Sequence, residues 1–279
     1  MPSLPQRISA NIRSVMSKTA VISGASSGLG YEIAKLLCLR YGCRVIGLAR
    51  RKEKLDDVRG ELGESFIPFV CDVTKDEDRA RLMEFITKNG YTPDILINNA
   101  GILPEFSCFT PERADELERV MELNFHSHVK MCAEFLPLLL RSEHGAIVNV
   151  ASSAALATLP GTAAYSASKS ALLAFTESLS LEYGKKLFVA AVCPGMTATE
   201  LFDSHEGSTL IAKFAPSAER TAKKIVRRLK RGRKMIVTGA DAHLMRGLNR
   251  IFGRAALKIF ALFFKIVKIP MFKGTFYHK

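Results

Sequence analysis

The sequence predicts an α/β protein built on a doubly wound parallel sheet of about seven strands. Short apolar segments typical of strands alternate with helical patterns from residue 18 to about residue 240. This alternation is typical of a parallel sheet with right-handed helical crossovers. The strand segments are apolar at nearly every position, as expected where helices cover both faces of a sheet. No internal repeat or Gly/Ser-rich linker divides the chain, so a single domain is expected.

The expected strands are the apolar runs at residues 18–23, 44–48, 66–71, 94–98, 146–150, 187–193 and 234–237. Helical patterns follow the first two, at residues 31–41 and at KEKLDDVRGEL, residues 52–62. A long helix is expected between the fourth and fifth strands. It should open at Thr110-Pro111, because threonine is a favourable N-cap and proline is tolerated at the first helical position.

The positive charge of the chain is concentrated near its C-terminus. The 279 residues carry a formal net charge of +13, yet residues 220–279 alone hold 17 lysines and arginines against one acid, Asp241. The preceding part is therefore slightly acidic. The basic C-terminal part requires a local explanation, such as a solvated face or an anionic partner.

Cysteine and histidine usage suits a cytosolic protein without a metal site. Six scattered cysteines, with no Cys-x-x-Cys pair, favour reduced thiols. Residues 1–17 lack a continuous apolar run and are expected to be a basic lead-in rather than a secretory signal. His126 and His128 lack a third candidate ligand, so packing or surface roles are expected for them. We therefore expect no bound metal and a cytoplasmic location.

A glycine-rich turn between the first strand and the following helix predicts a dinucleotide site. Glycines let the backbone approach a pyrophosphate, and the helix N-terminus presents free N–H groups to that charge. The spacing is G-x-x-x-G-x-G rather than the general G-x-G-x-x-G, so an ordinary turn is the alternative. The candidate binding residues of this turn are Gly24, Ser26, Ser27, Gly28, Leu29 and Gly30.

The end of the second strand indicates which dinucleotide binds. A carboxylate there would favour NAD, whereas the chain has Arg50 and Arg51. Guanidinium groups form charge-assisted bonds with a 2′-phosphate. These residues therefore predict NADP(H), with a solvated basic turn as the alternative.

Tyr165 and Lys169 lie four residues apart, on one face of an expected helix. A lysine ammonium one turn away would stabilise a phenolate and lower the tyrosine pKa, which is ordinarily near 10. A tyrosine with a lowered pKa can exchange a proton with the oxygen of an alcohol or carbonyl substrate. Ser152 ends the fifth strand and could donate a hydrogen bond to that substrate oxygen. The alternative is that Tyr165 and Lys169 are only neighbouring side chains on a helix surface, because isolated Tyr-x-x-x-Lys pairs are frequent.

Taken together, these motifs resemble the short-chain dehydrogenase/reductase family over residues 18 to about 240, especially its NADP-preferring ketoreductase and hydroxysteroid dehydrogenase members. The resemblance rests on SGASSGLG (23–30), CDVT (71–74), NNAG (98–101), Asn124 in MELNF, IVNVASS (147–153), YSASK (165–169) and PGMTAT (194–199). Two departures are small: Ser23 replaces the usual threonine, and Ala151 replaces a frequent serine. The resemblance implies a Rossmann-like fold.

The resemblance also implies a role for each matching residue. Tyr165 would be the catalytic acid/base, and Ser152 would polarise the substrate oxygen. Lys169 would lower the tyrosine pKa and bind the nicotinamide ribose, and Asn124 would hold a water of a proton relay. Further cofactor contacts would come from Asp72 and Val73 at the adenine, Asn99 at the adenosine ribose, and Pro194, Thr197 and Thr199 near the nicotinamide.

The expected function is NADP(H)-dependent interconversion of a ketone and a secondary alcohol. The preferred substrate is apolar, either a steroid or bile-acid-like alcohol or a long-chain oxoacyl compound. The alternative is a non-catalytic NADP-binding regulatory protein or a membrane-surface scaffold. Family members commonly form homodimers or homotetramers, and no nucleic-acid-binding module is recognised.

Three segments outside the motifs carry further expectations. Residues 200–216 fall where the family has a mobile loop over the substrate, and residues 218–231 should form a helix with a dense basic face. Residues 241–279 should form a basic, apolar helical extension after the catalytic domain, residues 18–240. The apolar run is too interrupted by lysines for a membrane span. The extension could lie on an anionic membrane, cover the substrate pocket or join subunits.

Overall fold

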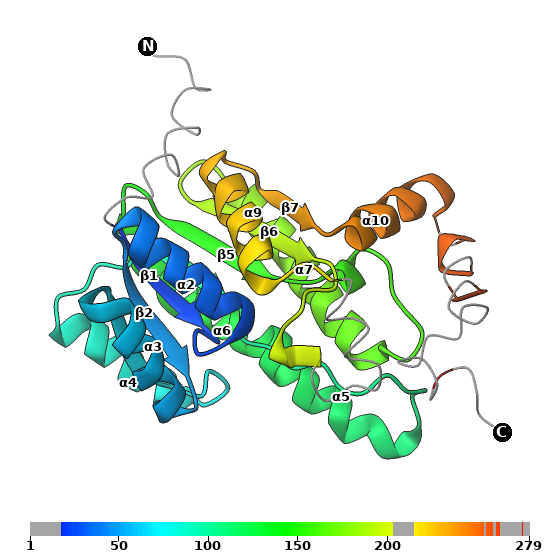
Figure 1. Ribbon diagram of the computed structural model, residues 1–279, viewed down its shortest axis with the longest axis horizontal. Coiled ribbons are helices and arrows are strands. Elements are labelled where there is room, and N and C mark those ends of the chain that lie inside the picture. The colour runs from blue at the N-terminus through cyan, green and yellow to red at the C-terminus, as the bar shows by residue number, and fades with distance from the viewer. Residues whose placement is uncertain (1–17, 203–214, 254, 259–260, 263–274, 276–279) are drawn as a thin grey trace, which may run out of the picture.

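A computed structural model shows a seven-stranded, all-parallel sheet with helices on both faces (Figure 1). It describes residues 18–202, 215–253, 255–258, 261–262 and 275. The strand order is β3-β2-β1-β4-β5-β6-β7, so the order reverses between β1 and β4. The predicted doubly wound fold is confirmed. In such sheets, ligands bind outside the carboxyl ends of the strands where the order reverses.

Each strand lies within two residues of its predicted position. The strands are Thr19–Ser23 (β1), Arg44–Ala49 (β2), Phe66–Val70 (β3), Ile95–Asn98 (β4), Ala146–Val150 (β5), Phe188–Pro194 (β6) and Met235–Thr238 (β7). The register aligns the strand ends that form the site, because Ser23 of β1 pairs with Leu48 of β2, and Asn98 of β4 pairs with Asn149 of β5.

The main helices are Gly28–Tyr41 (α2), Lys52–Leu62 (α3), Asp76–Lys88 (α4), Ala114–Met121 (α5), Ser127–Arg141 (α6), Ala163–Tyr183 (α7), Ala218–Lys230 (α9) and Ala240–Phe252 (α10). Helix α2 begins three residues before the predicted pattern, because the glycine-rich turn enters the helix directly. The predicted basic helix corresponds to α9.

Alternate residues of each strand point to opposite faces of the sheet, and each face has its own apolar core. Ala20 and Ile22 of β1 pack with residues of α2, α3 and α9. Val21, between them, packs with residues of α4, α6 and α7. Helices α2 and α9 lie side by side over the first face (Figure 1). Burial on both faces explains why the strands are apolar at most of their positions.

The segment between β4 and β5 differs from the single helix that the sequence predicts. It opens as predicted, with Thr110 preceding a short 3-10 turn at Pro111–Arg113 (η2). Helix α5 then leads into a π-helical segment, Glu122–His126 (η3), before α6 continues the chain. Such π segments are frequent at functional sites, and this one contains Asn124.

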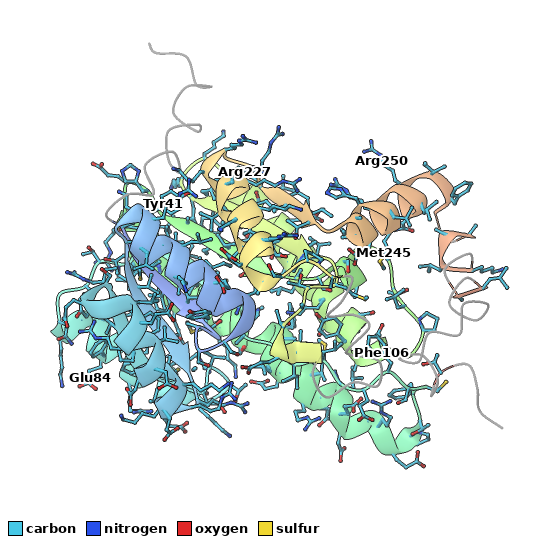
Figure 2. The ribbon with its side chains drawn as sticks, viewed as in Figure 1. Tyr41, Glu84, Phe106, Arg227, Met245 and Arg250 are labelled. Carbon is cyan, nitrogen blue, oxygen red and sulfur yellow. The ribbon has the colours of Figure 1, made fainter. Side chains whose placement is uncertain are left out.

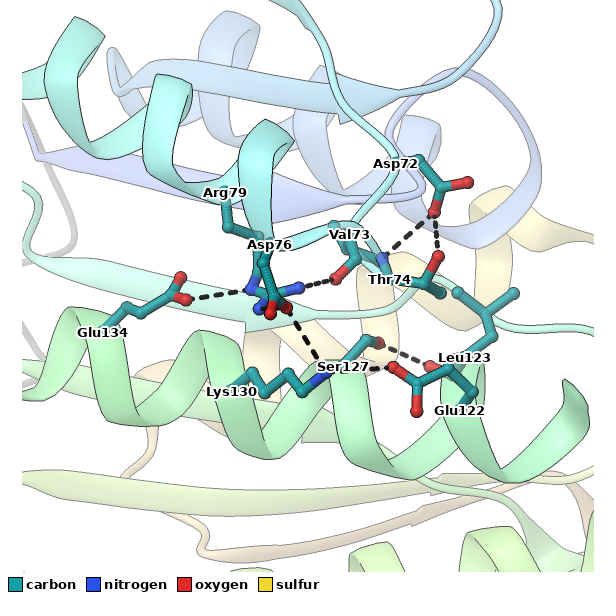
Figure 3. A network of polar contacts seen from close by, with 10 residues as sticks. All are labelled: Asp72, Val73, Thr74, Asp76, Arg79, Glu122, Leu123, Ser127, Lys130 and Glu134. Atoms are coloured by element: carbon teal, nitrogen blue, oxygen red, sulfur yellow. Dashed lines mark hydrogen bonds and ion pairs between the residues drawn. The ribbon is translucent and has the colours of Figure 1, made fainter. Parts of the chain in front are cut away.

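A buried arginine ties the loop after β3 to helices α4 and α6 (Figure 3). The Arg79 side chain is 3% exposed. Its Nε donates to Glu134 at 2.9 Å, its Nη1 donates to the carbonyl oxygen of Val73 at 2.9 Å, and its Nη2 contacts Asp76. In the same loop Asp72 accepts hydrogen bonds from the backbone and hydroxyl of Thr74. Arg79 therefore holds the loop that carries Asp72 and Val73.

Parts of several predicted segments lie outside the described residues. These are the basic lead-in at 1–17, most of the expected substrate loop at 203–214, and residues 254, 259–260, 263–274 and 276–279 of the C-terminal extension. Helix α10 forms the described beginning of that extension. Within the described ranges, no helix is both long and apolar enough to cross a membrane.

Candidate active site

A cleft of about 370 Å³ lies at the carboxyl ends of the central strands, where the strand order reverses. It is lined by nearly all of the residues that the sequence singles out, from the glycine-rich turn through Arg50 and Arg51 to Ser152, Tyr165, Lys169 and Thr199. Gly30 and Asn124 are not part of its lining but contact residues that are. The structure therefore brings the predicted residues together at one place.

The glycine-rich turn is shaped for close approach of a ligand. Gly24 and Gly28 adopt left-handed φ angles of +67° and +55°, which favour glycine. A Cβ atom at Gly30 would lie 2.2 Å from the carbonyl oxygen of Gly24, so only glycine fits there. Helix α2 begins here without a side-chain cap from Ser27 and without an acid in its first turn. Its free N–H groups and positive end suit a pyrophosphate.

Ser23 and Asn99 hold this turn against the end of β4. The Ser23 Oγ accepts hydrogen bonds from the backbone N–H groups of Asn99 and Ala100, at 2.9 and 3.0 Å. The Asn99 Nδ2 donates to the carbonyl oxygens of Ser23 and Gly24, at 3.1 and 3.3 Å. The serine therefore keeps a hydroxyl where the family usually has threonine. A contact of Asn99 with the adenosine ribose stays a prediction.

The basic end of the cleft contains an ion pair that the sequence does not predict. Glu200, after β6, binds Arg51 and Lys54, which lie 149 and 146 residues earlier in the chain. Arg50 and Arg51 are both exposed beside it. No periodicity or motif marks a pair between segments so far apart, so only the fold reveals it.

Ser152, Tyr165 and Lys169 meet at the other end of the cleft. Tyr165 hydrogen-bonds Ser152, whose Oγ also accepts from the backbone N–H of Ala154 at 3.2 Å. The Lys169 Nζ lies 5.9 Å from the centroid of the Tyr165 ring and donates to the carbonyl oxygen of Val150 at 3.0 Å. Lys169 is 4% exposed. The ammonium group is thus held beneath the tyrosine rather than in direct contact with its hydroxyl.

Burial dominates the electrostatics of this group. It raises the pKa of Tyr165, and the hydrogen bond with Ser152 lowers that pKa by a smaller amount. Burial also lowers the pKa of Lys169 to about 8. The net change at Tyr165 is therefore opposite in direction to the lowering expected from Lys169. The reason is that burial disfavours the charged phenolate, and only the hydrogen bond with Ser152 acts in the lowering direction.

Asn124 lies behind Lys169 and is fully buried. Its Oδ1 accepts from the backbone N–H of Ile102 at 2.9 Å, and its Nδ2 donates to the carbonyl oxygen of Ile102 and to the Ser168 Oγ. A Cβ atom at Gly101 would lie 3.1 Å from the Asn124 Oδ1 and 3.4 Å from the Lys169 Nζ. Asn124 is thus positioned next to Lys169, and its role in a water relay stays a prediction.

The two histidines of this region lie in different surroundings. His126 is exposed, whereas His128 is buried with its Nε2 2.9 Å from the carbonyl oxygen of Ala100. Burial lowers the pKa of His128 to about 3, with the Lys169 charge acting in the same direction, so the ring is neutral. In the part of the chain that the structure describes, no three His, Cys, Asp or Glu side chains gather as a metal site.

Asp241 is a site residue that the sequence reasoning missed. Its Oδ2 accepts a hydrogen bond from the backbone N–H of Met196 at 2.7 Å. A Cβ atom at Gly195 would lie 2.1 Å from the Asp241 Oδ1, and Gly239, at φ +101°, could not carry one either. Both glycines therefore make room for this carboxylate. The available signal was Asp241 itself, the single acid among the 60 C-terminal residues.

The site as a whole has two halves. A glycine-rich turn and a basic strand end form one, and a serine, a tyrosine and a buried lysine form the other. This combination, at the reversal point of a parallel sheet, defines a dinucleotide-dependent oxidoreductase site.

Sequence comparison agrees with that class. Residues 18–209 match the family described as short chain dehydrogenase. The chain belongs to this family.

The relatives are named for different substrates. The chain is 32% identical over 206 residues to an NADPH-dependent pterin aldehyde reductase from Arabidopsis thaliana. The aligned region covers 73% of this chain and 85% of the relative. The chain is 33% identical over 232 residues to a fatty acyl-CoA reductase from Acinetobacter baylyi, covering 80% and 77%. A short-chain dehydrogenase from Burkholderia cenocepacia, solved in complex with NADP, superposes with a TM-score of 0.75 at 28% identity, covering 89% of this chain and 98% of that one.

Proposed function

We propose that the protein is an NADP(H)-dependent oxidoreductase that interconverts a ketone and a secondary alcohol. The observation that carries the proposal is the hydrogen-bonded Ser152–Tyr165 pair, which faces the same cleft as the glycine-rich turn and Arg51. When bound, the nicotinamide dinucleotide supplies or accepts the hydride. The protein binds and orients the reactants and moves the proton.

Tyr165 is the proton donor for reduction. Because burial raises its pKa, the hydroxyl is protonated at neutral pH and can protonate the developing alkoxide. Ser152 donates a hydrogen bond to the same oxygen. The positive charge of Lys169 stabilises the phenolate that remains on Tyr165.

The residues of the first half of the cleft fit an NADP(H) molecule. The uncapped N-terminus of α2 can hold the pyrophosphate, and Arg50 and Arg51 can hold a 2′-phosphate. No acid at the end of β2 replaces them as a ribose ligand. The NADPH-dependent relative and the NADP-bound solved structure support the same cofactor.

An apolar substrate is favoured by the lining near Tyr165. That wall is formed largely by apolar side chains, namely Ile102, Leu103, Phe106, Leu159, Met196 and Leu201. A pocket of this kind suits a steroid or bile-acid-like alcohol or a long-chain oxoacyl compound. The similarity to a fatty acyl-CoA reductase supports the acyl alternative.

The test is NADPH oxidation across a panel of steroid, bile-acid, oxoacyl thioester and small ketones, with NADH in parallel. We expect turnover with NADPH and selection of an apolar ketone. Faster turnover with NADH would contradict the role given to Arg50 and Arg51. Tight NADPH binding without turnover of any ketone would favour the alternative, a non-catalytic NADP-binding regulatory protein.

The pKa of Lys169 predicts how reduction depends on pH. Because burial lowers this pKa to about 8, the stabilising ammonium charge is present below that pH and lost above it. We therefore expect kcat/KM for NADPH, at saturating ketone, to be level through neutral pH and to fall as pH rises through about 8. A profile that stays level to about pH 10, near the ordinary lysine pKa, would contradict this assignment.

A second proposal concerns location and is favoured by the outer face of α10. Leu244, Ile251 and Phe252 are 59%, 74% and 51% exposed there. The exposed Arg250 of α10 and Arg227 of α9 lie along the same, upper side of the molecule in Figure 2. Among the described residues neither arginine has an ion-pair partner, and apolar side chains beside such cations suit the surface of an anionic membrane. The protein would then be cytoplasmic and membrane-peripheral.

Co-sedimentation with vesicles tests this location. Binding is expected to vesicles that contain phosphatidylserine, not to phosphatidylcholine alone, and to weaken with salt. The double variant Ile251→Asp/Phe252→Asp should lose binding. Leu181→Asp, at a site that is 87% exposed on α7, is the matched control. Equal vesicle binding by the wild type, the double variant and the control would exclude the outer face of α10 as the membrane-binding surface. The resemblance to the family also predicts a homodimer or homotetramer. Light scattering on the same samples measures the molar mass that tests this expectation.

A further inference from the structure

The carboxylate of Glu200 is held like a bound anion at the basic end of the cleft. Its Oε1 lies 2.8 Å from the Lys54 Nζ, and its Oε2 lies 3.3 Å from the Arg51 Nη2. Ser27, in the glycine-rich turn, is a further hydrogen-bonding partner. Each carboxylate oxygen thus contacts a different cation. The ion pairs connect the short 3-10 turn Glu200–Phe202 (η5) to the beginning of α3.

The donors that hold this carboxylate are of the kind that a 2′-phosphate requires. In the proposed cofactor pose, the adenosine ribose lies at the end of β2, next to Arg50 and Arg51. A phosphate there needs cations or N–H and O–H donors on several sides. Lys54 is in the first turn of α3, three residues beyond Arg51, and its Nζ already reaches the anion that Arg51 binds. No sequence motif marks Lys54 or Glu200 as a cofactor contact.

We infer that Lys54 is a third cation of the 2′-phosphate site, and that Glu200 competes with the phosphate for Lys54 and Arg51. The inference rests on the proposed NADP(H) dependence. NADPH must displace the Glu200 carboxylate, or bind beside it against like-charge repulsion. NADH has no 2′-phosphate and can leave both ion pairs in place. Glu200 therefore limits the preference for the phosphorylated cofactor.

The competition is expected to be moderate in size. The side chains of Arg51, Lys54 and Glu200 are 53%, 38% and 47% exposed, so water screens their ion pairs. Exposed pairs of this kind are individually weak. A phosphate carries more negative charge than a carboxylate and wins the cations when it binds. Loss of Glu200 is thus expected to change affinity several-fold, not by orders of magnitude.

Binding of half-cofactors to the full-length protein tests the inference without turnover. The dissociation constants of 2′,5′-ADP and 5′-AMP are measured by calorimetry, because these ligands differ only in the 2′-phosphate. For Glu200→Gln we expect the constant for 2′,5′-ADP to fall about fivefold, with 5′-AMP unchanged. For Lys54→Gln we expect the constant for 2′,5′-ADP to rise about fivefold. In the double variant Lys54→Gln/Glu200→Gln, the gain in 2′,5′-ADP affinity from Glu200→Gln should be smaller than in the single variant.

The matched control is Glu53→Gln, which removes an exposed carboxylate next to Lys54 that makes no ion pair with Lys54 or Arg51 in the described structure. A gain equal to that of Glu200→Gln would mean that net charge alone acts, and would overturn the inference. Unchanged or weaker 2′,5′-ADP binding by Glu200→Gln would also overturn it. A wild-type protein that binds 5′-AMP as tightly as 2′,5′-ADP would instead contradict the proposed NADP(H) dependence.

Discussion

Replacement of Tyr165 by phenylalanine is expected to lower kcat by about 10³-fold while leaving the dissociation constant of NADPH nearly unchanged. Phenylalanine fills the same space but has no hydroxyl to protonate the substrate oxygen. The glycine-rich turn and Arg51 lie at the other end of the cleft and keep their geometry. Turnover is followed as NADPH oxidation with the best ketone of the panel, and binding is followed by calorimetry.

The matched control is Tyr183→Phe. Tyr183 lies on the same helix, α7, but packs against the apolar core between the sheet and helices α4, α6 and α7. This variant should retain kcat within about twofold, since it loses a hydroxyl that takes no part in proton transfer. If Tyr165→Phe kept full activity, Tyr165 could not be the proton donor. Loss of NADPH binding together with activity would mean that the tyrosine supports the cleft rather than the chemistry.

Arg79→Ala is expected to lower the free energy of unfolding by about 3 kcal/mol. The arginine is 3% exposed, and its removal leaves Glu134 and the carbonyl oxygen of Val73 without their hydrogen-bond donor (Figure 3). Equilibrium unfolding in urea measures the change. Because Arg79 holds the loop of Asp72 and Val73, weaker binding of 5′-AMP should accompany the loss of stability.

Arg81→Ala provides the comparison for this effect. Arg81 lies two residues further along α4 and also pairs with an aspartate three residues away, but its side chain is 58% exposed. An exposed pair contributes little, so the change should stay below about 1 kcal/mol. Equal effects of the two substitutions would show that helix propensity, not the buried network, accounts for the loss at Arg79.

The parts of the fold that the sequence predicts are those determined by local patterns. The strands at Thr19–Ser23 and Ala146–Val150 are visible because burial on both faces favours apolar residues at nearly every position. The glycine-rich turn is visible because its backbone angles and close contacts admit only glycine. The doubly wound parallel sheet follows from the alternation of helices and strands, whereas the order of its strands is seen only in the structure.

Contacts between distant segments leave no such pattern. Arg51 and Glu200 are separated by 149 residues, and ion pairs have neither a period nor a required spacing. The π segment around Asn124 was also missed, because its residues are compatible with an ordinary helix. The net pKa change of Tyr165 depends on burial, which a helical spacing of four residues from Lys169 cannot reveal. These features required the three-dimensional arrangement.

The hydrogen bond between Asp241 and Met196 has a consequence for how the molecule can be divided. Asp241 belongs to α10, the first helix of the C-terminal extension, yet it fixes the backbone next to Thr197 in the cleft. A division after residue 240 therefore separates an active-site loop from the carboxylate that shapes it. If a membrane binds the outer face of α10, as proposed above, it would act on a helix whose first turn is hydrogen-bonded to the backbone beside the cleft.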